Sequence, residues 1–143
     1  MKNLALILIL VFSFIGCNST KTLDNVKEEL ASTPNDTVKI ANEEIEYEII
    51  IIEPGFNVWL ETRAQPEGFY SQIFLETRNQ LLVTEWNNRV NQPGRYDPSL
   101  YEMRIEYDPF IDYGYEVNYI LYNYFIYFQL RYKQQLSSFV PRI

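Results

Sequence analysis

The sequence contains no histidine and only one cysteine among its 143 residues. Without histidine, neither a Ser-His-Asp triad nor a Cys-His pair can form, so the common types of nucleophilic hydrolase are excluded. A zinc site built from histidine and cysteine is excluded for the same reason, because no second thiol is available. A single cysteine also has no intramolecular disulfide partner. The one thiol therefore needs another explanation.

Positive charge is also scarce. The chain has 12 lysines and arginines against 19 acidic residues, which gives a formal net charge of −7. Nucleic-acid binding depends on neutralising phosphates with basic side chains, and adhesion to anionic lipid by charge alone needs them too. We therefore expect no nucleic-acid partner, and we expect no cofactor.

The cysteine ends an apolar leader. Lys2 precedes an apolar run, residues 4–15, whose length of about a dozen residues is typical of a signal peptide and too short to span a bilayer. The stretch Phe14-Ile15-Gly16-Cys17 resembles the bacterial lipobox, with Phe14 in place of the usual leucine. The resemblance implies a signal peptide over residues 1–16 and a diacylglyceryl group on Cys17, and several acyl chains anchor a protein stably. The alternative is an ordinary signal peptide with an incidental cysteine.

The residues after Cys17 indicate on which membrane, and on which face of it, the protein is anchored. Asn18-Ser19-Thr20 lacks the acidic run that resembles a surface-export signal, and it lacks the aspartate that resembles an inner-membrane retention signal. We therefore expect a lipid-anchored protein of the bacterial cell envelope, at the periplasmic face of the outer membrane.

A change in composition divides the mature chain. Residues 18–42 are polar and contain no aromatic residue, so they cannot bury enough apolar surface to offset the entropy of ordering. All 12 tyrosines lie at Tyr47 or later. The sequence therefore predicts a lipidated cysteine and flexible tether over residues 17–42, followed by one aromatic-rich globular domain over residues 43–143.

Within that domain, apolar periodicity predicts two strands and three helices. Alternation predicts strands over residues 45–52 and 101–107, paired antiparallel. Helical spacing predicts a short helix over residues 55–63, a longer one over 69–90 and a C-terminal one over 113–133. A strand is the alternative for the last segment because tyrosine favours strands, but the alternation fails at Ile120-Leu121-Tyr122. For the longer helix the pattern places five residues on the apolar side: Tyr70, Ile73, Phe74, Thr77 and Leu81.

The C-terminal helix is apolar on all faces and is expected to be central to the core. The predicted fold class is α+β, with a small two-stranded β element packed against about three helices. Seven tyrosines lie between Tyr113 and Tyr132. We expect some of them to surface as an amphipathic patch; the alternative keeps every ring in the core and every hydroxyl in water.

Four segments together resemble a family of small uncharacterised lipoproteins from Bacteroidota-type bacteria: YEIIIIEPGFNVWL, TEWNNRV, YDPSLYE and YDPFIDYGYEVNYILYNYF. The resemblance covers roughly residues 45–133. It implies a location in the cell envelope and a domain boundary, but it implies no activity and no catalytic residue.

Two functions are consistent with these features. The first is a non-catalytic protein-interaction module, with Trp86, Arg89, Arg95 and Tyr96 as candidate binding residues because tryptophan, tyrosine and arginine concentrate in binding hot spots. The alternative is a cell-wall glycan-binding module, with or without weak hydrolysis by paired carboxylates. A protein interface predicts a flat aromatic patch, whereas a glycan site predicts a groove with parallel rings and convergent carboxylate or amide groups.

The acidic residues that would serve a hydrolase are Glu85, Asp97, Asp108 and Asp112. A local explanation exists for most of them. Asp97 and Asp108 each precede a proline and are expected to cap turns, and Glu85 stands at i, i+4 from Arg89. The same turn chemistry accounts for the segment Asp108–Asp112 better than a calcium site does, so we expect no metal.

Overall fold

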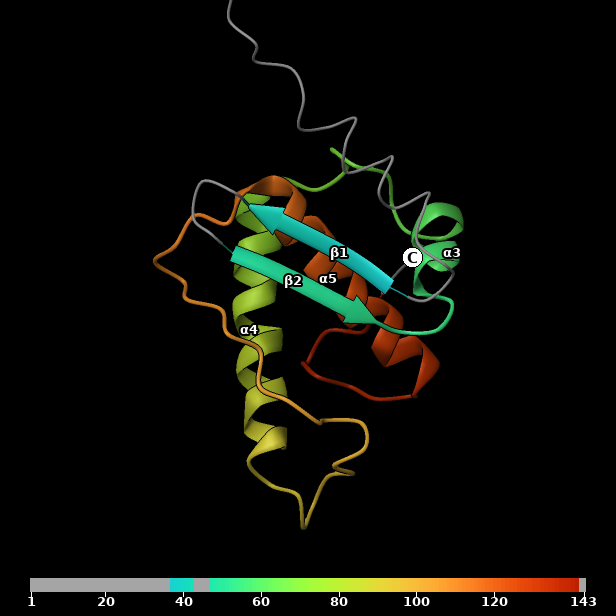
Figure 1. Ribbon diagram of the computed structural model, residues 1–143, viewed down its shortest axis with the longest axis vertical. Helices are drawn as coiled ribbons and strands as arrows, with labels where there is room; N and C mark the ends of the chain where they lie inside the picture. The colour runs from blue at the N-terminus through green and yellow to red at the C-terminus, as the bar shows by residue number, and fades with distance from the viewer. Residues whose placement is uncertain (1–36, 43–46, 142–143) are drawn as a thin grey trace, which may run out of the picture.

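The computed structural model describes residues 37–42 and 47–141. Strands β1 (Thr37–Asn42) and β2 (Tyr47–Ile52) form a two-stranded antiparallel sheet. Three helices follow, α3 (Phe56–Thr62), α4 (Gln72–Val90) and α5 (Gly114–Arg131), and Figure 1 shows the two long helices behind the sheet. The α+β fold class predicted from the sequence is confirmed.

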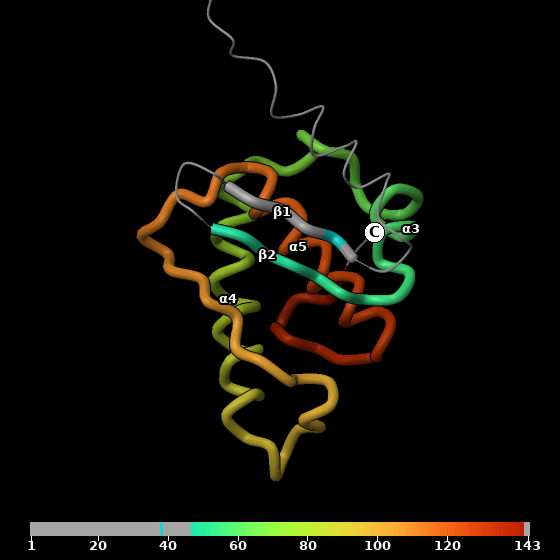
Figure 2. Tube along the Cα trace, in the orientation of Figure 1, coloured from blue at the N-terminus to red at the C-terminus, as the bar shows by residue number. Residues whose placement is uncertain are grey.

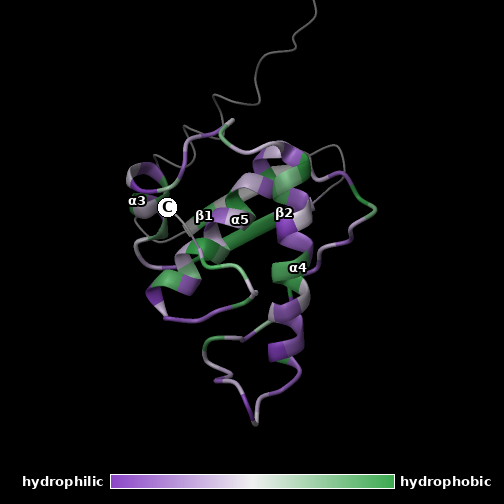
Figure 3. Ribbon diagram, turned by 180° about the vertical axis from the view of Figure 1, so that it is seen from behind, coloured by the Kyte–Doolittle hydropathy of each residue, from purple (hydrophilic) through white to green (hydrophobic). Residues whose placement is uncertain are grey.

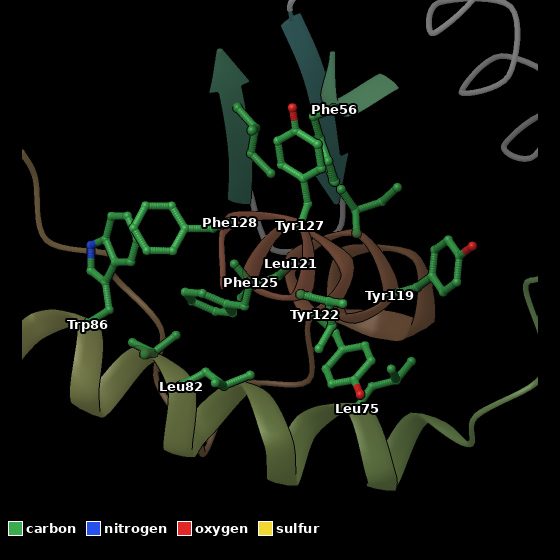
Figure 4. Close-up of a cluster of buried hydrophobic side chains, with 14 of the residues drawn as sticks. Phe56, Leu75, Leu82, Trp86, Tyr119, Leu121, Tyr122, Phe125, Tyr127 and Phe128 are labelled. Atoms are coloured by element: carbon green, nitrogen blue, oxygen red, sulfur yellow. The ribbon is translucent and has the colours of Figure 1, made fainter. Parts of the chain in front are cut away.

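Helix α5 lies in the middle of the fold. In Figure 4 the strands pack on one side of α5 and α4 packs on the other, so that the domain has three layers. This position explains why α5 is apolar all round, because a helix covered on both sides has no broad face for water. The predicted central role of the C-terminal helix is therefore confirmed. Its buried residues are Val117–Asn123 and Phe125–Gln129.

Strand β1 corrects the predicted domain boundary. It pairs with β2 in the register Val38 to Ile51, and the side chain of Val38 is only 1% exposed, within the core. The six residues of β1 had been assigned to the tether because they lack aromatics. Pairing with an apolar partner strand and contact with α5 compensate for their modest apolar content, so the folded domain includes residues 37–42. The predicted leader, Cys17 and the rest of the tether lie outside the described residues.

The predicted second strand at residues 101–107 is wrong. This segment runs alongside α4 in Figure 2, and side chains of α4 take the place of a partner strand. Asn87 donates from Nδ2 to the Ile105 carbonyl and accepts from the Ile105 N–H, both at 2.9 Å. Trp86 Nε1 donates to the Met103 carbonyl at 2.9 Å. The alternating pattern does not show whether the backbone groups of this segment bond to a strand or, as here, to side chains of a helix.

The predicted apolar face of α4 is also wrong. Ile73 is 76% exposed and Leu81 is 51% exposed, whereas the buried side of the helix contains Asn79 and Arg89. Both polar residues have partners there: Asn79 bonds to Asn118 of α5, and Arg89 bonds to Tyr101. The buried face of α4 is a different apolar stripe, Leu75, Leu82, Val83 and Trp86, together with these two polar residues, whose hydrogen-bond partners make their burial tolerable.

The seven tyrosines from Tyr113 to Tyr132 do not form a surface patch. Four are buried and three are half-buried. Their hydroxyls reach backbone groups near the surface, as Tyr127 does with the Pro54 carbonyl at 2.6 Å and Tyr119 with the Gln65 carbonyl at 2.8 Å. The alternative is therefore correct for the rings, whereas the hydroxyls of Tyr119 and Tyr127 bond to backbone carbonyls of the protein and not to water alone. Among the described helices, none combines the length and apolar character needed to cross a bilayer.

Candidate functional site

The structure buries two of the four predicted binding residues. Trp86 is 5% exposed and stands in the core between α4 and α5, where its ring centroid lies 4.8 Å from that of Phe128 and 5.0 Å from that of Tyr101 (Figure 4). Its indole nitrogen is bonded to the Met103 carbonyl. Trp86 therefore stabilises the fold and is not part of a surface hot spot.

Arg89 is a structural cation. Its guanidinium donates to Glu85 at 2.7 Å, to the Tyr101 hydroxyl at 2.8 Å and to the Gln135 carbonyl at 2.5 Å. Burial alone would lower the pKa of Arg89, but the hydrogen bonds with Glu85 and Tyr101 outweigh burial and raise it. The predicted Glu85–Arg89 pair is confirmed, and the bond from Arg89 to the Gln135 carbonyl ties α4 to the segment after α5.

Arg95 and Tyr96 remain near the surface. The guanidinium carbons of Arg89 and Arg95 lie 4.7 Å and 5.3 Å from the centre of the Tyr96 ring. The structure thus brings three of the four predicted residues together, but as a cation–π cluster in which Arg89 is buried and Tyr96 half-buried. Arg95 alone is fully at the surface. The prediction that these four residues form one binding surface is not supported by this arrangement.

The acidic residues are engaged locally. Asp97 accepts from the backbone N–H of Ser99 at 2.9 Å and from its hydroxyl at 2.7 Å, and these bonds lower the pKa of Asp97. Asp108 accepts from the N–H of Phe110 at 2.9 Å. The predicted turn roles of Asp97 and Asp108 are confirmed. In the part of the chain that the structure describes, no group of three or more potential metal-binding side chains occurs.

A different part of the surface is hollowed. A groove of about 430 Å³ lies between the N-terminal half of α4 and the segment that precedes α5. Its volume is within the range of pockets that take a ligand or a few side chains of a partner. The groove is lined by Gln72, Glu76, Thr77, Gln80, Tyr107, Pro109, Phe110, Ile111 and Asp112. We call it the α4 groove.

The wall opposite α4 is a turn held by hydrogen bonds. The hydroxyl of Tyr113 accepts from the N–H of Asp108 at 2.8 Å, and the Asp108 carbonyl accepts from the N–H of Ile111 at 3.1 Å. The Asp108 carboxylate accepts from the N–H of Phe110. Asp and Pro favour such a turn because aspartate bonds the backbone two residues on and proline presets its own backbone angle. The turn is therefore fixed in shape.

This turn holds an aromatic ring in water. Phe110 is 95% exposed, and the neighbouring Ile111 is 44% exposed. Figure 3 shows the segment between α4 and α5 coloured hydrophobic at its outermost point. Ile73, which is 76% exposed, shares the α4 face of Thr77 and Gln80 because it precedes them by four and seven residues. The turn side of the groove is therefore apolar at Phe110 and Ile111, the α4 side of the lining is polar, and Ile73 adds an exposed apolar side chain to α4 outside that lining.

The floor of the groove carries two carboxylates joined by one amide. Gln72 Nε2 donates to Glu76 at 2.8 Å and to Asp112 at 2.7 Å, so it links α4 to the start of α5. Burial raises the pKa of Tyr107, and the charges of Glu76 and Asp112 raise it further. One amide of α4 thus holds the Glu76 and Asp112 carboxylates beside each other in the groove lining.

Asn118 fixes the base of the groove. Its Oδ1 accepts from the Tyr107 hydroxyl at 2.7 Å and from Asn79 Nδ2 at 3.1 Å, and its own Nδ2 donates to the Gly114 carbonyl at 2.8 Å. Asn118 is fully buried on α5. One side chain of the core thus holds α4, α5 and the groove wall in a single arrangement.

The sequence contained a usable signal for this groove. Tyr107-Asp108-Pro109 was recognised as a turn, and the next residue is a phenylalanine. A large apolar ring inside a turn between Asp-Pro and Asp112 has no core to enter, and this combination indicates an exposed ring. The contribution of Gln72, Glu76 and Gln80 had no such signal, because it depends on which face of α4 is buried.

A family model described as a family of unknown function, DUF6146, matches residues 4–140. The matched range includes the predicted signal peptide and tether as well as the described domain. Comparisons with curated proteins and with solved structures gave no match.

Proposed function

We propose a function for this chain, which belongs to the DUF6146 family of unknown function. The proposal is that it is a lipid-anchored envelope protein whose domain is a non-catalytic protein-interaction module. The observation that carries the proposal is Phe110, a ring 95% exposed on a hydrogen-bonded turn at the edge of the α4 groove. The partner is a second protein of the envelope.

Phe110 suits this role on energetic grounds. Fully burying a phenylalanine side chain contributes about 1.5–3 kcal/mol relative to leaving it in water. The fold itself gains little of this contribution, because the ring is almost wholly exposed. A partner that covers the ring gains it, and the turn is already ordered by the hydrogen bonds of Asp108, so little conformational entropy is lost on binding.

The number of available rings favours a protein over a glycan. Sugars bind on aromatic platforms, and a glycan groove was expected to show two or three parallel rings. The two rings that line the α4 groove are Tyr107 and Phe110. The Tyr107 ring is stacked on Tyr113, with centroids 4.8 Å apart and planes 25° apart, so one of its faces is covered. Phe110 is left as a single anchor, which is typical of a protein contact.

A glycan-binding function is the second candidate, and one observation favours it. Gln72, Glu76 and Asp112 form a connected amide and carboxylate set on the floor of the groove, and Gln80 adds a second amide to the lining. Groups of this kind bond sugar hydroxyls. The tests below are designed so that a glycan partner gives a different result.

The anchor is tested by fractionation. Replacing Cys17 with Ser removes the predicted acylation site, and the protein is then expected in the soluble fraction or as an uncleaved precursor. Membrane fractions of the two strains are compared by immunoblot. A processed Cys17→Ser protein that still needs detergent for release contradicts the lipid anchor.

The interaction is tested by formaldehyde crosslinking of intact cells that produce the wild-type, Phe110→Ala or Met103→Ala protein. Met103 is 76% exposed and lies outside the groove lining, so it is a matched control for loss of an exposed apolar side chain. A discrete protein adduct is expected from wild type and from Met103→Ala, and a strongly reduced one from Phe110→Ala. Equal adducts from all three proteins, or no adduct from wild type, refute the role of the groove.

A further inference from the structure

We infer that the partner segment that enters the α4 groove is an extended peptide carrying a lysine or arginine two positions away from an apolar residue. The inference rests on the proposed interaction function and specifies the chemistry of the partner. It assigns the cation to Glu76 and Asp112 and the apolar side chain to Phe110 and Ile111.

The charge of the groove supports a cation. Glu76 and Asp112 both line it, and no lysine or arginine belongs to its described lining. Gln72 supplies one amide to the two carboxylates, at 2.8 Å and 2.7 Å, and thereby holds them close to each other. An ionised carboxylate accepts about four hydrogen bonds, so both keep acceptor sites for an ammonium or guanidinium group.

The geometry of an extended peptide fits the separation in the groove between the carboxylates, Glu76 and Asp112, and the apolar residues, Phe110 and Ile111. In an extended segment the side chains at i and i+2 point to the same side, about 6–7 Å apart. A basic residue and an apolar residue two positions apart can therefore contact the carboxylate floor and the Phe110 rim together. Both walls are accessible to a peptide, because Thr77 and Gln80 on α4 and Phe110 and Ile111 on the turn line the groove and are exposed.

Charge also argues against the other occupants. An acidic peptide or a phosphate group would meet Glu76 and Asp112 without a compensating cation from the described lining. A second copy of this chain carries the same net charge of −7 and would be repelled at long range. A basic segment is attracted at long range, which raises the rate of association.

The test uses the chain from Asn18 onward and three acetylated peptides. Each peptide has one leucine, and the residues two positions before and after it are both lysine, both glutamine or both glutamate. Binding is measured by amide chemical shifts in nuclear magnetic resonance spectra. The lysine peptide is expected to bind, to shift residues 72–80 and 107–112, and to weaken as salt is added. The glutamine peptide should bind about two- to five-fold more weakly for each exposed ion pair that it lacks, and the glutamate peptide should not bind.

The matched variant is the double substitution Glu76→Gln and Asp112→Asn. Each new amide keeps an oxygen that accepts from Gln72, so the hydrogen-bonded floor is preserved while its charge is removed. An unchanged thermal melt verifies the fold of this variant. The preference for lysine over glutamine is expected to vanish in it. Binding of the lysine and glutamine peptides is expected to fall in Phe110→Ala but not in Met103→Ala.

Two outcomes overturn the inference. One is equal binding of the lysine and glutamine peptides, or shifts that lie outside the groove. The other is binding of a soluble cell-wall oligosaccharide, run as a parallel titration, to the groove residues in place of the lysine peptide. If the formaldehyde adduct nevertheless depends on Phe110, the interaction function stands and only the chemistry of the partner is wrong. If that adduct is independent of Phe110, the proposed function fails as well.

Discussion

Replacing Trp86 with Ala is expected to destabilise the domain about as much as replacing Phe125 with Ala. Both side chains are buried, at 5% and 0% exposure, and their ring centroids lie 6.0 Å apart in one cluster. Removing a buried Trp or Phe side chain typically costs about 3–5 kcal/mol. Trp86→Ala also leaves the Met103 carbonyl without its donor, which adds about 1 kcal/mol or more.

This cost is large against the whole stability of a small domain, which is about 5–15 kcal/mol. Urea unfolding followed by far-ultraviolet circular dichroism measures it for the soluble chain from Asn18 onward. Trp86→Phe keeps one aromatic ring but loses the indole donor and part of the ring volume, so it should cost less than Trp86→Ala and more than the roughly 1 kcal/mol of the lost hydrogen bond alone. If Trp86→Ala lies within 1 kcal/mol of wild type, the assignment of Trp86 to the core is wrong and a binding role for it returns.

Three further predictions concern the backbone, a side-chain bridge and pH. Gly55 has a φ of 81°, and an added Cβ would lie 3.3 Å from the Tyr127 hydroxyl. Gly55→Ala should therefore lower the free energy of unfolding in urea by about 1–3 kcal/mol. The control Gly94→Ala, whose Cβ would meet no atom within 4 Å, should not lower it. Asn87→Ala removes both bonds to the Ile105 backbone and should cost about 1–3 kcal/mol, with faster amide exchange at Ile105; unchanged exchange there argues against the bridge. Burial raises the pKa of several tyrosines from 10.0 to about 12 in the folded state, namely Tyr47, Tyr119 and Tyr122. Because these folded-state pKa values are raised, their contribution to stability is complete below about pH 10 and is lost as pH rises toward 12; a flat unfolding free energy across that range, measured beside tyrosinate absorbance, contradicts the burial of these hydroxyls.

The sequence predicted the helices well and the pairing of extended segments poorly. α5 was readable because a helix apolar on every face has to be central. The segment 101–107 alternates as a strand does, but its backbone bonds go to Asn87 and Trp86 of a helix. Periodicity indicates which side of a segment is apolar. It does not indicate which groups form hydrogen bonds with the backbone N–H and carbonyl groups of that segment.

The candidate site was mispredicted for a related reason. Trp86 and Arg89 were selected by residue type, yet their burial depends on the orientation of α4, which Asn79 and Arg89 help to set through bonds with other elements. The α4 groove brings together residues 72–80 and 107–112, and that juxtaposition arises only when the chain folds back along α4. Phe110 was the one member with a local signal, a ring inside an Asp-Pro turn.

The central claim is that the α4 groove contacts an envelope protein, and photo-crosslinking from within the groove tests it most directly. A photoreactive amino acid is placed at Thr77, which lines the groove, or at Asn88, which is exposed on the same helix roughly 16 Å further along its axis. Adducts formed in intact cells are then treated with protease or with a cell-wall hydrolase and identified by mass spectrometry. We expect a protease-sensitive adduct from position 77 and none from position 88. An adduct that only the cell-wall hydrolase removes, or the same adduct from both positions, contradicts the account.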